Sequence, residues 1–236
     1  MIAIEQNLAA VRQRLDASAK QAGRKAPSLL AVSKGQPASA IRRAFAAGQS
    51  EFAESYVQEA LAKIAETSDL AIVWHFIGPI QSNKTAAIAE HFAWVHSVDR
   101  LKIAERLAAA RPATLAPLNV CLQVNISFEA SKSGAAPDDL PLLAAAVARL
   151  PRLKLRGLMT IPAPTDDVHE QRRAFQRVRE RYDSLRRDGH DLDTLSMGMS
   201  QDLEAAIAEG ATVVRVGTAI FGPRGEMGKP VKITSS

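Results

Sequence analysis

The sequence of 236 residues contains a single cysteine, Cys121, and this scarcity excludes a disulfide within the chain. Cys121 lies inside the apolar run LNVCLQV. A free cysteine in such a run is expected to be a small buried side chain, and a catalytic thiol is the alternative.

The sequence also lacks any apolar run of about 18 residues, so no segment is expected to span a membrane. Charged residues near the N-terminus interrupt the apolar core that a signal peptide needs. Apolar residues recur there at helical spacing instead, at Ile4, Leu8, Val11 and Leu15. This stretch therefore predicts an amphipathic helix at the start of a cytoplasmic protein.

Metal-binding and nucleic-acid-binding patterns are missing as well. The histidines form neither H-E-x-x-H nor a helical i, i+4 pair with a flanking carboxylate, so no metal is expected. The net charge of +5 leaves nucleic acid as an alternative partner. However, many of the arginines fall in segment 170–190, off an apolar helical stripe and among carboxylates. A solvated helix face is the expectation, because no zinc-finger, RRM or KH signature is present.

The composition, 47% hydrophobic and 23% charged, is that of a globular protein with ample core. Eight short apolar runs read as strands, separated by helix-patterned segments or short loops. The runs are 29–33, 51–55, 72–78, 94–98, 118–126, 155–161, 194–198 and 212–217. Alternating strands and helices predict a parallel sheet of the α/β class.

Eight such units without a linker favour closure into a single (β/α)8 TIM barrel with an extra N-terminal helix. The alternative is an open doubly wound sheet, but its G-x-G-x-x-G fingerprint is replaced by SKGQPAS after the first strand. We expect the barrel and its first helix to occupy residues 1–224. Residues 225–236 then form a short tail.

Lys34 stands where the first strand should end, followed by Gly35 and Pro37. In a barrel, chemistry is found at the carboxyl ends of the strands, so a lysine at this place is a candidate nucleophile toward a carbonyl. An ordinary surface amine is the alternative.

The loops after the seventh and eighth strands are the usual phosphate site of such barrels. Here Ser200 is expected to cap a helix that begins near Gln201, and Gly198, Gly217 and Thr218 offer close backbone approach and further donors. Alternatively, Ser200 only caps a helix and Gly217 only turns the chain.

Arg215 shares one face of the eighth strand with Gly217, because side chains alternate along a strand. If that face is the barrel interior, Arg215 needs a polar or ligand partner; packing outward against a helix is the alternative. A ligand with a phosphate, an aldehyde and an aromatic acceptor would suit the two loops, Lys34 and Arg215 together. Pyridoxal 5′-phosphate has all three groups.

At these residues the sequence resembles the YggS/PROSC family of pyridoxal phosphate homeostasis proteins, whose barrel is of the alanine racemase N-terminal domain type. The resemblance runs from the first helix to Arg224. Its motifs are AVSK, FAESYVQEA, WHFIGPIQSNK, NVCLQVNIS followed by SKSG, RGLMTIPAP, LSMGMSQDLEAAIAEG and VRVGTAIFG.

The resemblance implies a cofactor site for pyridoxal 5′-phosphate. It implies that Lys34 forms the Schiff base and that Arg215 faces the pyridine nitrogen. The phosphate cradle matches Ser200, Gly217 and Thr218, with Met199 beside it. Met159 matches a residue close to the ring, and His75 falls near the pocket, where an interior histidine without cofactor contact is the alternative.

Ser55 and Lys132 are two positions whose role the resemblance leaves open. The family commonly has GENYVQE where this chain has AESYVQE, so Ser55 replaces an asparagine near the cofactor and has a shorter reach. Lys132 matches a second family lysine, for which receipt of the cofactor from Lys34 and a plain surface role are the two interpretations.

The family implies a carrier and regulator of pyridoxal phosphate, acting in vitamin B6 homeostasis without robust catalysis. Possible recipients are apoenzymes that require the cofactor, and a monomer is expected. A weak amino-acid racemase is the alternative, although neither Tyr56 nor Tyr182 is expected to serve as the second base that racemisation needs. An interaction protein with a basic surface is the third hypothesis.

Overall fold

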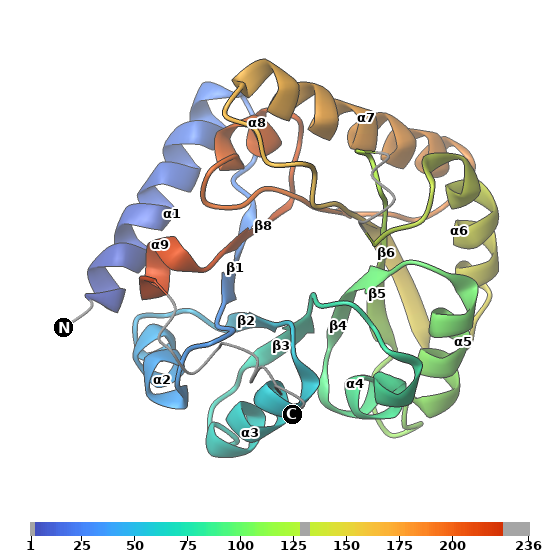
Figure 1. The fold of residues 1–236 in the computed structure, drawn as a ribbon, viewed down its shortest axis with the longest axis horizontal. Helices are drawn as coiled ribbons and strands as arrows, with labels where there is room; N and C mark the ends of the chain where they lie inside the picture. Colours follow the sequence, from blue (N-terminus) through green and yellow to red (C-terminus); the bar gives the residue numbers. More distant parts are fainter. Residues whose placement is uncertain (1–2, 128–132, 224–236) are drawn as a thin grey trace, which may run out of the picture.

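The computed structural model describes residues 3–127 and 133–223. Lys132, Arg224 and the predicted tail 225–236 lie outside the described residues. Within the described part, eight parallel strands form one closed barrel in which each strand pairs with its sequence neighbours and β8 pairs with β1 (Figure 1). The predicted single (β/α)8 barrel with an extra N-terminal helix is confirmed.

All eight predicted strands are present, with ends that differ by a few residues at most. They are β1 Ser28–Val32, β2 Glu51–Glu54, β3 Val73–Phe76, β4 Trp94–Val98, β5 Leu118–Gln123, β6 Leu153–Met159, β7 Thr194–Ser196 and β8 Val213–Val216. Seven of the eight apolar runs extend beyond the carboxyl end of their strand, the exception being 94–98. There the chain leaves the sheet and enters the loops that carry the candidate site.

The helices surround the barrel (Figure 1). They are α1 Ile4–Gln21, α2 Ala38–Ala46, α3 Val57–Glu66, α4 Thr85–His91, α5 Leu101–Ala110, α6 Leu140–Ala148, α7 Val168–Arg187, α8 Leu203–Ala208 and α9 Thr218–Phe221, with 3₁₀ turns at Ser82–Lys84 and Pro137–Asp139. Helices α4 and α9 are short, with 7 and 4 residues.

The N-terminal helix α1 packs against α2, α8 and α9 on the outside of the barrel (Figure 1). Its predicted apolar stripe is buried, at Ile4, Leu8, Val11 and Leu15. Each of these side chains contributes about 1.5–3 kcal/mol when removed from water. Helix α1 therefore covers the place where the barrel closes between β8 and β1.

Side chains of each strand alternate between two environments. Leu29 and Ala31 point outward into the apolar layer between sheet and helices, whereas Leu30 points inward. The interior is more polar than that layer, because it holds His75, His96, Ser196 and Arg215. The outer layer supplies most of the apolar burial, so the interior is left for polar groups.

Two further expectations concern Cys121 and the arginine-rich segment. Cys121 is fully buried, and burial raises the pKa of its thiol to about 12, so it is the expected small interior residue. The segment forms α7, whose stripe with Phe175 and Tyr182 is buried. Arg172 and Arg181 on its outer side pair with carboxylates of neighbouring elements.

None of the described helices is both long and apolar enough to cross a membrane. Likewise, the described residues contain no group of three or more histidine, cysteine, aspartate or glutamate side chains placed to hold a metal ion.

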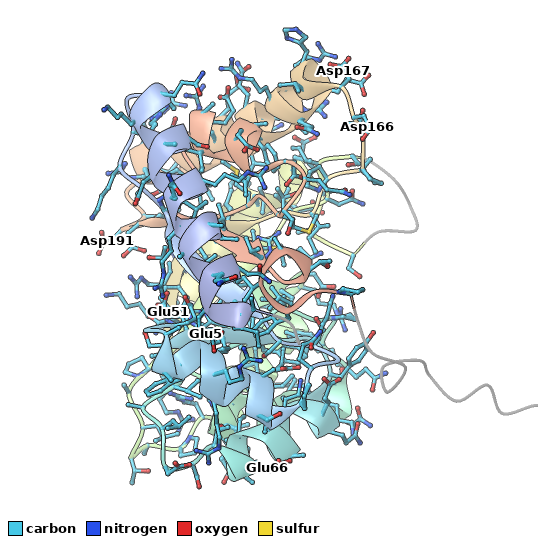
Figure 2. All side chains as sticks on the ribbon, turned by 90° about the vertical axis from the view of Figure 1, so that its left-hand side faces the viewer. Glu5, Glu51, Glu66, Asp166, Asp167 and Asp191 are labelled. Atoms are coloured by element: carbon cyan, nitrogen blue, oxygen red, sulfur yellow. The ribbon has the colours of Figure 1, made fainter. Side chains whose placement is uncertain are left out.

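The barrel has two different ends, which Figure 2 shows from the side. Glu51 and Asp191 mark the end where strands begin, and Asp166 and Asp167 mark the end where strands finish. We call these the amino end and the carboxyl end of the barrel.

Candidate functional site

Lys34 lies at the carboxyl end of the barrel, in the turn between β1 and α2. The preceding residue continues the sheet by one hydrogen bond, from Ser33 N–H to the Ala53 carbonyl at 3.0 Å. Gly35 then turns the chain at φ 72°, a conformation that favours glycine. Lys34 is half-buried in this turn.

A buried ion cluster holds this turn in place. The Lys63 ammonium donates to the Ser33 carbonyl at 2.7 Å, to Glu54 at 2.7 Å and to Glu59 at 2.5 Å. Glu59 also accepts from the Gly35 N–H, at 2.5 Å. Burial raises the pKa of Glu54, although the Lys63 charge opposes that shift. The cluster fixes the backbone on both sides of Lys34.

Sequence reasoning did not find this cluster. The i, i+4 spacing of Glu59 and Lys63 on α3 was a visible signal for an ion pair. The contacts with Glu54 and Ser33 were not visible, because they depend on how α3 packs against the ends of β1 and β2.

Arg215 is 3% exposed and reaches the Ser196 hydroxyl inside the barrel, so the outward alternative is wrong. Its guanidinium donates to the Ser196 carbonyl at 2.6 Å, the Ser196 hydroxyl at 2.9 Å and the Thr160 carbonyl at 2.8 Å. Burial lowers the pKa of Arg215 to about 10, which leaves it charged at neutral pH. Among the described residues no carboxylate forms an ion pair with it, and two of its five N–H donors find no acceptor.

A chain of hydrogen bonds leads from Arg215 down the barrel. The Ser196 hydroxyl lies 2.8 Å from His96 Nδ1, and His96 Nε2 lies 2.9 Å from His75 Nδ1. Burial lowers the pKa of both histidines, that of His75 to about 3, so both rings are neutral. We assign Ser196 as donor to His96, and His96 as donor to His75, because the reverse order leaves the Ser196 hydrogen without a described acceptor.

The loops after β7 and β8 lie beside one another at the carboxyl end. The Arg215 N–H donates to the Gly198 carbonyl at 2.9 Å, which ties the first loop to β8. Gly198 has φ 95°, and a Cβ there would approach the Ala206 Cβ to 2.6 Å. A Cβ at Gly217 would lie 3.1 Å from the Val32 carbonyl oxygen. Glycine at these positions lets the first loop pack closely against α8 and the second against the end of β1.

The predicted cap of the helix after β7 is wrong. Helix α8 begins at Leu203 rather than near Gln201, and Ser200 lies in the turn before it. The cause is Asp202, whose carboxylate accepts the Met199 N–H at 2.6 Å and closes that turn. The Ser200 hydroxyl therefore does not cap α8.

The acidic residues of this region are held by partners. Glu204 pairs with Arg14 of α1 at 2.5 Å and 2.7 Å, and Arg14 also donates to the Ser200 carbonyl at 2.9 Å. No described residue accepts a hydrogen bond from the backbone N–H groups of Ser200, Gly217 and Thr218. These amides in two adjacent loops form a donor set that suits a phosphate.

The structure places the other predicted residues in two groups. Met159 is buried at the end of β6, in register with Ser196 of β7, and the half-buried Ser55 follows β2, so both belong to the carboxyl end. His75 does not join them, because its ring packs against His96 and lines a cavity at the amino end. The geometry therefore favours the alternative in which His75 is an interior histidine without cofactor contact.

The donor set at the carboxyl end fits pyridoxal 5′-phosphate. Open amides are available for the phosphate, Lys34 supplies an amine, and Arg215 retains N–H donors for an aromatic nitrogen.

Comparisons with known proteins agree with this geometry. Residues 6–225 match the family model described as alanine racemase, N-terminal domain. A Pseudomonas aeruginosa protein named pyridoxal phosphate homeostasis protein is 62% identical over 226 residues, which cover 95% of this chain and 97% of the relative. A protein of the same name from Escherichia coli K12 is 53% identical, with 94% and 97% covered.

The chain belongs to the pyridoxal phosphate homeostasis proteins. Among solved structures, PipY of Synechococcus elongatus with pyridoxal phosphate bound is 41% identical and superposes with a TM-score of 0.83. That comparison covers 93% of this chain and all of PipY. The family predicted from the motifs is therefore confirmed, together with its alanine racemase-like barrel.

Replacing Lys63 by methionine should destabilise the protein strongly. The change keeps most of the side-chain volume but leaves the buried Glu54 without its cation, which costs about 3–5 kcal/mol. Urea unfolding measures the effect, with the exposed Lys102→Met as the matched control. A loss of less than about 1 kcal/mol would show that the cluster does not hold the turn.

The buried histidines should make stability fall with acid. The pKa of His75 lies near 3 when folded and near 6.5 when unfolded, so only the unfolded chain takes up a proton between these values. Stability is complete above about pH 6.5 and declines as the pH falls toward 3. Between about pH 6.5 and pH 5, His75→Gln should lose about 2 kcal/mol less unfolding free energy than the wild type. Urea unfolding at the two pH values measures this difference. If wild type and His75→Gln lose the same unfolding free energy between them, the assignment of His75 as neutral is contradicted.

Proposed function

We propose that this chain binds pyridoxal 5′-phosphate as a Schiff base on Lys34 and acts as a carrier and regulator in intracellular vitamin B6 homeostasis, in the cytoplasm, without robust catalysis. The observation that carries the proposal is the buried Arg215, which retains unused donors at the same barrel end as Lys34. The names of the curated relatives and the cofactor bound to PipY support it.

Each residue at the carboxyl end receives a role in this proposal. Lys34 supplies the amine for the aldehyde. The phosphate is held by the backbone N–H groups and hydroxyls of Ser200 and Thr218, by Gly217, and by the loop that contains Met199. Met159 packs near the ring, and Ser55 contacts the cofactor directly or through a water. We propose no direct contact for His75, which acts on Arg215 only through His96 and Ser196.

The proposed lack of robust catalysis rests on Arg215. Pyridoxal phosphate stabilises a carbanion best when its ring nitrogen is protonated, and a neighbouring guanidinium disfavours that protonation. Racemisation also needs a second base. The Tyr182 hydroxyl donates to the Leu192 carbonyl at 2.9 Å on the outer layer, and the Tyr56 side chain is 59% exposed. The proposed partners are therefore the cofactor and the apoenzymes that receive it, and the proposed state is a monomer.

Lys34→Ala should abolish covalent capture of the cofactor. Wild-type protein mixed with pyridoxal phosphate should gain a visible absorption band, and borohydride should fix the pyridoxyl group on the peptide that contains Lys34. The matched control Lys102→Ala removes an exposed lysine and should behave as the wild type. Mass spectrometry of the reduced peptides reads out the position.

Two results would overturn the proposal. One is a wild-type protein that neither colours nor retains the cofactor. The other is a reduced pyridoxyl group found on another lysine while Lys34 is unmodified.

A further inference from the structure

The amino end of the barrel contains a cavity of about 670 Å³, at the opposite end of the barrel from Lys34. It is lined by strand beginnings and by the loops that lead into them, among them Arg24, Glu51, His75, Trp94 and Arg156. Figure 2 shows Glu51 at this end of the molecule. Neither the family's cofactor site nor the proposed carrier function uses this cavity.

One buried polar atom points to a ligand here. His75 is 3% exposed, and its Nε2 has no hydrogen-bond partner among the described residues. The other ring nitrogen, Nδ1, is committed to His96 at 2.9 Å. With Nδ1 as the acceptor of that bond, Nε2 carries the hydrogen and is a buried donor at the cavity wall. An unsatisfied donor at such a place costs about 1–3 kcal/mol unless a partner binds.

The charges at the rim indicate the sign of that partner. Arg24 and Lys25, in the loop before β1, have no ion-pair partner among the described residues. The third cation, Arg156, is already paired with Asp193 and lies 4.5 Å from the Trp94 ring centre. After that pair is set aside, the cavity has two cations against the single carboxylate of Glu51.

We propose that this cavity binds a small anion through a carboxylate or phosphate-like group, with Arg24 and Lys25 as its counter-charges and His75 Nε2 as a hydrogen-bond donor. Trp94 lies beside this site, because its ring stacks on His75 with centres 5.5 Å apart and the Arg156 guanidinium lies 4.5 Å from its ring centre.

Glu51 makes binding depend on pH. Its carboxylate lies 4.0 Å from His75 Nε2, where it would repel the anion, and burial already raises its pKa. A bound anion therefore favours protonated Glu51. The other charged or titratable groups around Glu51 are Arg24, Lys25, His75, His96, Arg156 and Asp193 in this cavity, and Arg12 and Asp16 of α1 in the adjoining one.

The cavity is connected to the cofactor end by the chain His75, His96, Ser196 and Arg215. An acceptor placed on His75 Nε2 would polarise each hydrogen bond of that chain in the same direction. The anion is thus placed to influence Arg215, a residue that it does not touch.

The test uses Trp94 as a local reporter. Trp74→Phe leaves Trp94 as the only tryptophan of the full-length protein. Sulfate and benzoate are the probes, because both stay ionised from about pH 5.5 to pH 8 and they separate phosphate-like from carboxylate recognition. Sodium chloride at equal ionic strength corrects for screening. We expect a saturable change of Trp94 fluorescence with one or both probes, and tighter binding at the lower pH.

Variants identify the binding groups. In the Trp74→Phe background, the pair Arg24→Ser and Lys25→Ser should weaken binding about tenfold or more, whereas Lys20→Ser, an exposed lysine outside the cavity, should not. Glu51→Gln should tighten binding at the higher pH and flatten the pH dependence. The titrations are made without added pyridoxal phosphate, so this test stands or falls separately from the function proposed for Lys34.

The proposal is overturned if neither probe gives a saturable signal beyond that of chloride. It is also overturned if binding survives the pair Arg24→Ser and Lys25→Ser unchanged, since the anion would then lie elsewhere. Binding that Glu51→Gln leaves unchanged at the higher pH would remove Glu51 from the site and would contradict the proposal as well.

Discussion

The buried guanidinium of Arg215 is the constraint on which the interior of this barrel depends. A cation away from water needs acceptors, and here they come from the ends of two strands, the Ser196 carbonyl and hydroxyl and the Thr160 carbonyl. The Ser196 hydroxyl in turn requires His96, and His96 requires His75. One charge thus accounts for a polar column inside a sheet whose outer face is apolar.

This arrangement separates stability from function. The layer between sheet and helices provides the apolar burial that stabilises the fold, and α1 extends it over the closure of the barrel. The interior and the carboxyl-end loops are then free to hold groups that contribute little to stability or oppose it. Two neutral histidines, a fully buried Glu54 and amides without partners are all of this kind. Both barrel ends present unsatisfied donors, and the polar column joins them.

The sequence predicted the eight strands and their closure because buried parallel strands appear as short apolar runs between helical segments. It also placed Lys34 at the carboxyl end and allowed Arg215 in the interior. It misplaced the start of α8, because the Asp202 carboxylate accepts the Met199 N–H and closes a turn that contains Ser200, so the helix begins only at Leu203.

Contacts across the barrel were beyond sequence reasoning. His75 and His96 are separated by 21 positions and meet only because β3 pairs with β4 in a particular register. Lys63 reaches Ser33 and Glu54 only through the packing of α3. A pattern along the chain indicates which face of a strand or helix a residue occupies. It does not give the register between strands, which decides the residue's neighbours.

Transfer of the cofactor tests the central claim most directly. Protein loaded with pyridoxal phosphate and freed of excess would be mixed with an apoenzyme that needs the cofactor, while recovered enzyme activity and D-alanine formed from L-alanine are measured together. The account predicts that loaded wild type restores the apoenzyme and forms D-alanine far more slowly than a typical enzyme. Turnover of alanine at about 1 s⁻¹ or faster, with no activation of the apoenzyme, would contradict it and indicate a racemase.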